Sequence, residues 1–181
     1  MSIKISKVTI DDAPELLRIY APYVKNTAIS FEYDVPSKEE FKSRITDISS
    51  KYPYLKATVD GKVVGYAYAN TFKSRAAYDW SVETTIYLDQ DFRRMGIGRI
   101  LYEMLEKELK DIGILNMNAC IASPLGPSKY LSLDSIDFHL RMGFKEVGTF
   151  HKSGFKFGEW FDMMWMEKMI GEHTSSPKKI F

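Results

Sequence analysis

Apolar residues along the chain recur at two spacings, and each change of spacing marks the boundary of a predicted element. Alternation places every second side chain on one face of a strand, whereas a spacing of three or four does so for a helix. The alternating segments predict strands in 3–10, 54–72 (two strands), 78–89, 115–122 and 145–169 (two strands). The helical segments are 13–24, 36–48, 98–112 and 135–143. This order predicts an α/β domain with a mixed central β-sheet flanked by helices.

Local signals support several of these boundaries. Ser37 and Glu40 have the spacing of a capping box at the start of the second helix. Asp60 and Gly61 form the pair preferred at a tight hairpin turn, because both tolerate positive φ angles. Gly113 is placed to end the helix that begins near Gly98.

The most informative segment is "WSVETTIYLDQDFRRMGIGRILYEML", in which a strand leads through a basic loop into an amphipathic helix. The first turn of a helix has unpaired amides and the positive end of the backbone dipole, so it can bind an anion such as phosphate. Glycines let a ligand approach the backbone, and arginines add positive charge. The candidate residues are Arg93, Arg94, Met95, Gly96, Ile97, Gly98 and Arg99.

Two common phosphate-binding motifs do not match this loop. A dinucleotide fingerprint requires a third glycine where the chain has Leu101, and a nucleotide triphosphate loop requires Gly-Lys-Ser/Thr. The sequence therefore favours another phosphate-containing ligand.

Length and composition fit one globular domain. The chain has 181 residues, 45% of them hydrophobic, and no internal repeat. We expect a single domain over residues 1–170 and a loosely ordered tail over residues 171–181, where no periodic apolar pattern remains.

The charge balance argues against several partners. The 25 basic and 24 acidic side chains leave a formal net charge of +1, which predicts no binding to nucleic acid or to a membrane surface. The three histidines are scattered without ligand spacing, so no metal is expected. The chain has a single cysteine, Cys120, and lacks both a secretion signal and a long apolar run, which together predict a cytoplasmic protein.

The loop and its surroundings resemble a known family. "RRMGIG" between a strand and a helix is similar to the signature of GNAT N-acetyltransferases. The blocks "ISFEYDVPS", "YPYLKATVDGKVVGYAYA", "RAAYDWSVETTIYL", "SIDFHLRMGF" and "GTFHKSGFKFGEWFDMMWME" resemble its phosphinothricin acetyltransferase-like branch. The resemblance extends to about Lys168. It implies the GNAT acyl-CoA N-acyltransferase fold, acetyl-CoA as cosubstrate with its pyrophosphate in the loop, and a homodimer.

The resemblance also implies a reaction. The amine of phosphinothricin, methionine sulfoximine, methionine sulfone or a related L-amino acid would attack the thioester directly in a ternary complex. An ammonium group has no lone pair, so a base must first remove its proton. Glu83 occupies the position of the proposed base; the alternative is a solvated glutamate on the polar face of a strand.

His139 occupies the position of a helix tyrosine or histidine that protonates the CoA thiolate in the family. A histidine can donate a proton, but a histidine that only makes a local hydrogen bond is an equally good interpretation. Both interpretations stay open.

The remaining cofactor contacts come from the resemblance. Ile86, Tyr87 and Leu88 correspond to backbone groups that pair with pantetheine, although their side chains also suit a sheet core. Ser132 replaces a family asparagine that contacts CoA. The connection around residues 123–131 is about seven residues longer than is usual in the family, and it either supplies a new contact or is a tolerated surface excursion.

The acceptor site is the least determined part. Phe31, Lys73, Arg75 and Tyr78 are candidates, together with Tyr33 and Trp80. Arg75 can hold a carboxylate with two hydrogen bonds, while the aromatic residues suit core packing equally well. A pocket lined by Arg75 would favour an amino acid, and an open groove would favour a peptide.

Two other functions remain as alternatives. One is acetylation of a protein N-terminus or of another amine such as an aminoglycoside. The other, from a different class, is a noncatalytic acyl-CoA-binding module, which would show binding without turnover.

Overall fold

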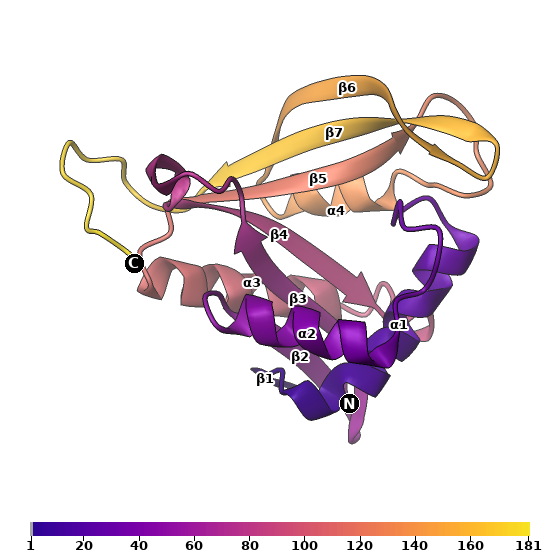
Figure 1. Ribbon diagram of the computed structural model, residues 1–181, viewed down its shortest axis with the longest axis horizontal. Coiled ribbons are helices and arrows are strands. Elements are labelled where there is room, and N and C mark those ends of the chain that lie inside the picture. The colour runs from indigo at the N-terminus through magenta and orange to yellow at the C-terminus, as the bar shows by residue number, and fades with distance from the viewer. Residues whose placement is uncertain (1) are drawn as a thin grey trace.

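The chain folds around one seven-stranded mixed sheet, as the computed structural model describes it for residues 2–181 (Figure 1). The strand order is β1-β2-β3-β4-β5-β7-β6, and every neighbouring pair is antiparallel except β4 and β5. The strands are β1 (Ile3–Lys7), β2 (Tyr54–Val59), β3 (Lys62–Thr71), β4 (Ser81–Leu88), β5 (Asn116–Pro124), β6 (Lys145–Lys156) and β7 (Glu159–Met169). The helices are α1 (Ala13–Asn26), α2 (Lys38–Ser49), α3 (Ile97–Asp111) and α4 (Asp134–Arg141). The predicted order and fold class are confirmed.

The helices cover both faces of the sheet. Leu101, Leu105 and Leu109 of α3 are fully buried against one face. Leu16 of α1 and Ile45 of α2 belong to a second buried cluster on the opposite face. Because both faces are covered, β3 and β4 carry apolar side chains in both directions.

The predicted start and stop signals are present with one shift. Ser37 accepts a hydrogen bond from the Glu40 amide at 3.1 Å and so caps α2. Asp60 and Gly61 both have positive φ angles, 47° and 82°, at the hairpin turn. Helix α3 begins at Ile97 rather than at Gly98, because Gly96, with φ 80°, takes the capping position.

Strands β4 and β5 pair over a very short stretch. Their register joins Ser81, Val82 and Glu83 to residues 116–118, and no later residue of β4 pairs with β5 within residues 2–181. Figure 1 shows the two strands starting close together and then spreading apart. The sheet is therefore split at its centre, immediately after Glu83.

The C-terminal tail contains no helix or strand, but its end contacts the domain. The Trp80 indole donates a hydrogen bond to the Lys178 carbonyl at 2.9 Å. The Phe181 ring packs edge-on against Tyr52, with the ring centroids 5.7 Å apart, and Ile180 contacts the core. The end of the tail therefore packs against the segments that directly precede β2 and β4.

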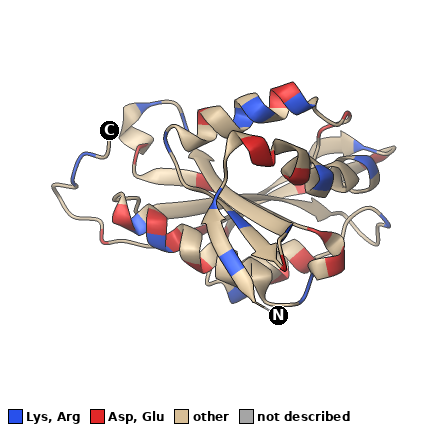
Figure 2. Cartoon of the chain, turned by 90° about the horizontal axis from the view of Figure 1, so that it is seen from below, with Lys and Arg blue, Asp and Glu red and all other residues tan. Residues whose placement is uncertain are grey.

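Charged side chains show no segregation by sign. Figure 2 shows lysines and arginines interspersed with aspartates and glutamates along the helices. No helix within residues 2–181 combines the length and apolar character needed to cross a bilayer.

Helix α3 offers a direct test of the core. Leu105 is fully buried, whereas its neighbour Met104 is 38% exposed. Leu105→Ala should lower the free energy of unfolding by about 2–5 kcal/mol, because it removes buried methyl groups and leaves a cavity. Met104→Ala should change it by less than about 1 kcal/mol. Urea unfolding followed by circular dichroism measures both, and equal effects would contradict the assigned orientation of α3.

Candidate active site

The split between β4 and β5 opens into a cavity of about 220 Å³. Its walls are residues 83–87 of β4, residues 119–122 of β5, residues 29–31 after α1, and Tyr102, Leu131, Ser135 and His139. A cavity between two strands of one sheet exposes backbone groups that a continuous sheet would pair. Such groups are available to a ligand that lies along the strand.

Glu83 lies at the point where the strands separate. It is the last residue of β4 that pairs with β5, opposite Asn118, and its side chain lines the cavity. Burial raises the pKa of the Glu83 carboxyl group above its usual range, and the positive charge of Lys73 offsets part of this effect. A half-buried carboxylate with a raised pKa suits proton abstraction near neutral pH.

Side-chain hydrogen bonds join the strands where the backbone ladder ends. The Thr84 hydroxyl donates to the Asn118 carbonyl at 3.1 Å, and the Asn118 amide donates to the Val82 carbonyl at 3.0 Å. The Tyr102 hydroxyl, from α3, lies 3.1 Å from the Thr84 oxygen. Thr84, Asn118 and Tyr102 are all buried. The position of the split is thus held by a buried polar network.

His139 is part of the same network. Its Nδ1 lies 2.7 Å from the Ser135 carbonyl oxygen, which can only accept, so Nδ1 carries a hydrogen and donates it. Nε2 lies 3.0 Å from the Tyr102 hydroxyl. Burial lowers the pKa of His139 to about 4, so the ring is neutral at pH 7 and Nε2 is an acceptor that faces the Tyr102 hydroxyl. The single hydrogen of that hydroxyl goes either to Nε2 or to the Thr84 oxygen, because the Thr84 hydrogen is given to the Asn118 carbonyl. Of the two interpretations left open, the geometry favours the local hydrogen bond.

The loop of residues 93–99, called the phosphate loop below after its predicted ligand, lines a second cavity of about 310 Å³. This second cavity shares Ile29, Ile86 and Ser135 with the first. Its other walls include Arg93, Arg94, Gly96, Gly98 and Arg99 from the loop, with Asp134, Phe138 and Arg141 from α4. The shared residues show that the two cavities adjoin, and together they are called the channel below.

A side chain would disturb the loop at Gly96 and at Gly98 for different reasons. Gly96 has φ 80°, a left-handed conformation that strains other residues. Gly98 is close to its neighbours, because an added β-carbon would lie 3.3 Å from Phe138 and 3.4 Å from Leu88. The loop therefore depends on both.

The arginines of the loop are already paired with acidic side chains. Arg93 Nη2 lies 2.9 Å and Arg94 Nη2 lies 3.6 Å from the two carboxylate oxygens of Asp134, at the start of α4. Arg99 pairs with Glu103 on its own helix. Asp134 thus links the phosphate loop to α4.

Ser132 lies away from both cavities, whereas Ser135 lines both. The Ser132 oxygen accepts a hydrogen bond from the Asp134 amide at 3.4 Å, and Ser132 is not among the residues that line either cavity. Ser135, one helical turn before His139, lines both cavities. It is a hydroxyl on the channel that the sequence alone did not single out.

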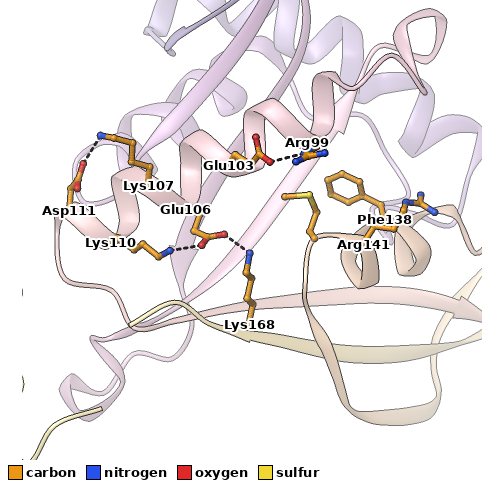
Figure 3. A pocket seen from close by; sticks show the side chains of 10 residues that line it. Arg99, Glu103, Glu106, Lys107, Lys110, Asp111, Phe138, Arg141 and Lys168 are labelled. Carbon is orange, nitrogen blue, oxygen red and sulfur yellow. Dashed lines mark hydrogen bonds and ion pairs between the residues drawn. The ribbon is translucent and has the colours of Figure 1, made fainter. Parts of the chain in front are cut away.

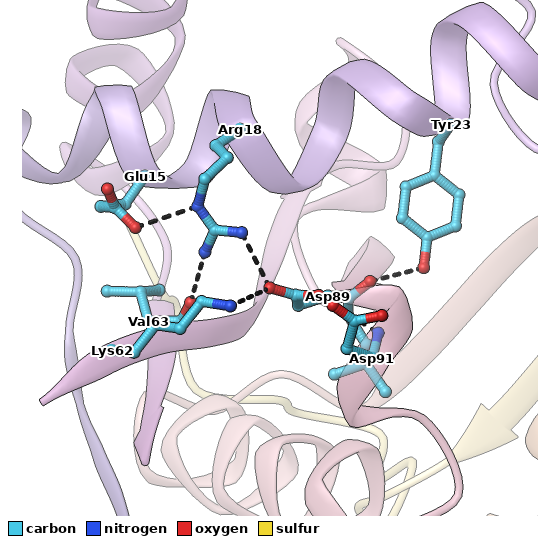
Figure 4. A network of polar contacts seen from close by, with 8 residues as sticks. Glu15, Arg18, Tyr23, Lys62, Val63, Asp89 and Asp91 are labelled. Carbon is cyan, nitrogen blue, oxygen red and sulfur yellow. Dashed lines mark hydrogen bonds and ion pairs between the residues drawn. The ribbon is translucent and has the colours of Figure 1, made fainter. Parts of the chain in front are cut away.

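Helix α1 fixes the end of β4 (Figure 4). The Tyr23 hydroxyl donates to the Leu88 carbonyl at 2.6 Å. Arg18 and Lys62 lie 2.8 and 3.0 Å from the Asp89 carboxylate. Burial acts to raise the pKa of Asp89, but these two cations outweigh it and the pKa is lowered. The last residues of β4 are therefore held from the side of the sheet opposite α3.

The predicted acceptor residues do not gather at one place. Phe31 lines the cavity, and Lys73 lies close enough to Glu83 to affect its pKa. The Lys73 ammonium also lies 5.6 Å from the Trp165 ring. Arg75 and Tyr78 are exposed, and neither is among the residues that line the cavity within the described part of the chain.

A buried lysine organises the wall that carries Phe31. Lys156, at the end of β6, donates hydrogen bonds of 2.7, 3.0 and 2.7 Å to the carbonyls of Val24, Thr27 and Ser30. Its side chain is buried although no motif indicated a role for it. Lys156 thereby holds the loop after α1 against the β6–β7 hairpin.

A larger open groove lies outside this channel, between α3, α4 and β7 (Figure 3). Most of its charged side chains pair with one another: Glu106 contacts Lys110 at 2.7 Å and Lys168 at 2.5 Å, and Arg99 contacts Glu103. Arg141 also lines the groove and makes no ion pair with the described residues.

The surroundings of Cys120 do not favour a role for its thiol as a nucleophile. Burial, with a smaller effect of Glu83, raises the pKa of the Cys120 thiol to about 12, so the nucleophilic thiolate is scarce at neutral pH. No group of three His, Cys, Asp or Glu side chains suitable for a metal ion occurs in residues 2–181.

A parallel strand pair that opens beside a glycine-containing loop, with a carboxylate at the split, is the arrangement that the resemblance to acyl-CoA-dependent transferases implies. Comparison with known proteins agrees. The profile of the acetyltransferase (GNAT) domain matches residues 5–165. The chain belongs to the GNAT acetyltransferase family and is an acetyl-CoA-dependent N-acetyltransferase.

Two curated relatives are similar over most of their length. Phosphinothricin N-acetyltransferase of Streptomyces viridochromogenes is 31% identical over 161 residues, covering 89% of this chain and 84% of the relative. L-methionine sulfoximine/L-methionine sulfone acetyltransferase of Pseudomonas aeruginosa is 31% identical over 179 residues, covering 98% and 100%. The predicted family and branch are confirmed.

A solved structure shows the same fold with its cosubstrate. The GNAT superfamily phosphinothricin acetyltransferase of Sinorhizobium meliloti, in complex with AcCoA, superposes with a TM-score of 0.89 and is 33% identical. The match covers 99% of this chain and 95% of that one.

Gly96 provides a test of the phosphate loop. Gly96→Ala places a β-carbon on a residue with φ 80°, at a cost of about 1–2 kcal/mol, so the loop should relax away from its binding conformation. We expect the KM for acetyl-CoA to rise about 5- to 30-fold. Gly126→Ala is the control, because an added β-carbon there meets no atom within 4 Å. An unchanged KM in Gly96→Ala would count against the loop as the phosphate site.

The protonation state of His139 can be measured by ¹⁵N NMR. We expect one protonated nitrogen, Nδ1, and no titration between about pH 5.5 and 8, because burial disfavours the charged ring. Tyr102→Phe should shift the Nε2 resonance, since it removes the donor, and leave Nδ1 nearly unchanged. Titration of His139 near its ordinary pKa in the intact protein would contradict the assignment.

Proposed function

We propose that the protein acetylates the amine of a small amino-acid-like substrate, such as phosphinothricin, methionine sulfoximine, methionine sulfone or a related L-amino acid. The observation that carries this proposal is the position of Glu83, whose carboxylate lines the cavity at the split between β4 and β5. The similarity to acetyltransferases named for these amino acids supports the substrate class.

Glu83 acts as the base in this proposal. Its carboxylate removes a proton from the substrate ammonium, directly or through a water molecule, and the neutral amine attacks the thioester within a ternary complex. Attack along the split needs no covalent enzyme intermediate, which agrees with the protonated thiol of Cys120.

The phosphate loop and β4 hold the cosubstrate. Residues 93–99 offer the first-turn amides of α3, the open backbone at Gly96 and the arginines Arg93 and Arg94, so they suit a pyrophosphate. Acetyl-CoA supplies the activated acetyl group when it is bound there. Ile86, Tyr87 and Leu88 lie beyond the split, and those of their backbone groups that neither pair with β3 nor bind Tyr23 are available to align pantetheine and to polarise the thioester carbonyl.

His139 acts through Tyr102 in this proposal. Its two nitrogens are both engaged, so it holds Tyr102 and Thr84 in place rather than donating to the thiolate directly. Ser135, which lines both cavities, takes the place expected for Ser132 as the serine near the start of α4 that contacts the cosubstrate.

Lys73 is the candidate partner for the substrate carboxylate. It lies near Glu83, whereas Arg75 does not line the cavity in the part of the chain that the structure describes. Acetylation of a protein N-terminus or an aminoglycoside remains the alternative enzyme function. The homodimer stays a prediction of the family resemblance, and the cytoplasmic location stays a prediction from the sequence.

The experiment is acetyl-CoA turnover across free L-amino acids, their sulfone and phosphinic analogues, short peptides and an aminoglycoside. Turnover with free amino acids supports the proposal, and turnover with peptides alone contradicts it. Acetyl-CoA binding without turnover on any amine would identify a noncatalytic binding module instead.

Replacing Glu83 tests the base. Glu83→Gln should lower kcat by about 10²–10⁴-fold, because the amide cannot accept the ammonium proton. In the intact enzyme, kcat/KM should fall as the pH drops through the raised pKa of Glu83, since protonation removes the base. The exposed Glu39, replaced by Gln, is the control. Equal activity of both variants would remove Glu83 from the mechanism.

A further inference from the structure

The long connection between β5 and α4 folds back onto the cavity. The Ala28 amide donates to the Tyr130 carbonyl at 3.0 Å, and the Tyr130 ring stacks on Phe157 with centroids 4.3 Å apart. Leu131 is 7% exposed, packs with Ala28 and Phe161, and lines the cavity. Leu131, at the end of the connection, therefore belongs to the cavity wall, whereas residues 125–127 are exposed.

The wall that this connection completes is uncharged. Phe31 lies over Gly154, where an added β-carbon would come within 2.3 Å of the ring, and so faces the same side as Leu131 and Phe161. Among the residues that line the cavity within residues 2–181, Glu83 is the one carboxylate and there is no lysine or arginine.

Of the cations near this wall, Lys73 is assigned above to the α-carboxylate of the substrate, and the two others are already used. The Lys156 ammonium directs its three hydrogens to the carbonyls of Val24, Thr27 and Ser30. Arg44 pairs with Glu32 at 2.7 Å. Neither can turn to a ligand without leaving buried acceptors or a carboxylate unpaired.

We infer that the acceptor's side chain is uncharged, and that the wall formed by Phe31 and Leu131, with Phe161 packed behind it, selects methionine sulfone or sulfoximine over phosphinothricin. This inference rests on the proposed function. It assigns substrate selection to Leu131, which comes from the long connection.

Methionine sulfone and phosphinothricin form a matched pair for this purpose. Both are L-amino acids with a two-carbon linker to a tetrahedral centre that carries a methyl group and two oxygens. The sulfone is neutral, whereas the phosphinate is an anion at pH 7. Transfer of an anion into a cavity that is lined by the Glu83 carboxylate and by no lysine or arginine is costly, while a neutral group of the same shape avoids that cost.

The first test compares the two substrates with the intact enzyme. We expect kcat/KM for methionine sulfone to exceed that for phosphinothricin by about tenfold or more, because the anion finds no cation in the wall. A ratio of one, or a preference for phosphinothricin, would overturn the inference while leaving the proposed acetyltransferase function intact.

The second test introduces a cation. Leu131→Lys should reduce the sulfone preference by about fivefold or more, since the ammonium can pair with the phosphinate. Leu133→Lys is the control, because Leu133 is 53% exposed two residues further on and does not line the cavity. Equal ratios in the two folded variants would overturn the role of Leu131.

The outcomes separate the two proposals. If no amino acid is acetylated although acetyl-CoA binds, the proposed function fails and the inference fails with it. If amino acids are acetylated and the ratio is reversed, only the inference fails. The ratio for the intact enzyme decides the charge preference even if Leu131→Lys does not fold.

Discussion

The separation of β4 from β5 is the constraint on which the rest of the site depends. The backbone ladder between them stops at Glu83 and Asn118, and the side chains of Thr84, Asn118 and Tyr102 then fix how the strands part. A ladder that continued would leave no cavity and no free backbone for a ligand. The split therefore creates the channel and places the Glu83 carboxylate at its end.

Elements on both sides of the sheet hold this arrangement in place. Helix α1 fixes the end of β4 through hydrogen bonds of Tyr23 and Arg18. Asp134 of α4 forms an ion pair with the loop residue Arg93. On the acceptor side, Lys156 and the long connection before α4 bring three distant segments together. Each contact is local, but together they fix the walls of the two cavities around Glu83 and the loop of residues 93–99.

Much of the fold and half of the site could be predicted from the sequence. The order of the elements, the hairpin at Asp60–Gly61 and the cap at Ser37 follow from periodicity and turn chemistry, which act over a few residues. The loop at 93–99 is recognisable for the same reason. Tyr102 was detectable only as an inward-facing helix residue, and Asn118 only as a polar residue in an apolar strand, because their hydrogen bonds join elements far apart in the chain.

The sequence by itself determined the family, the mixed sheet, the phosphate loop and the candidate base, because these are carried by local patterns and short motifs. The tertiary structure decided which side chains share the cavity. It placed Ser135 rather than Ser132 on the channel and left Arg75 outside the residues that line it. It also brought both nitrogens of His139 within hydrogen-bonding distance of partners and buried Lys156, whose ammonium donates to three backbone carbonyls. These outcomes depend on how distant segments pack, and the spacing of residues along the chain does not encode that packing in a readable form.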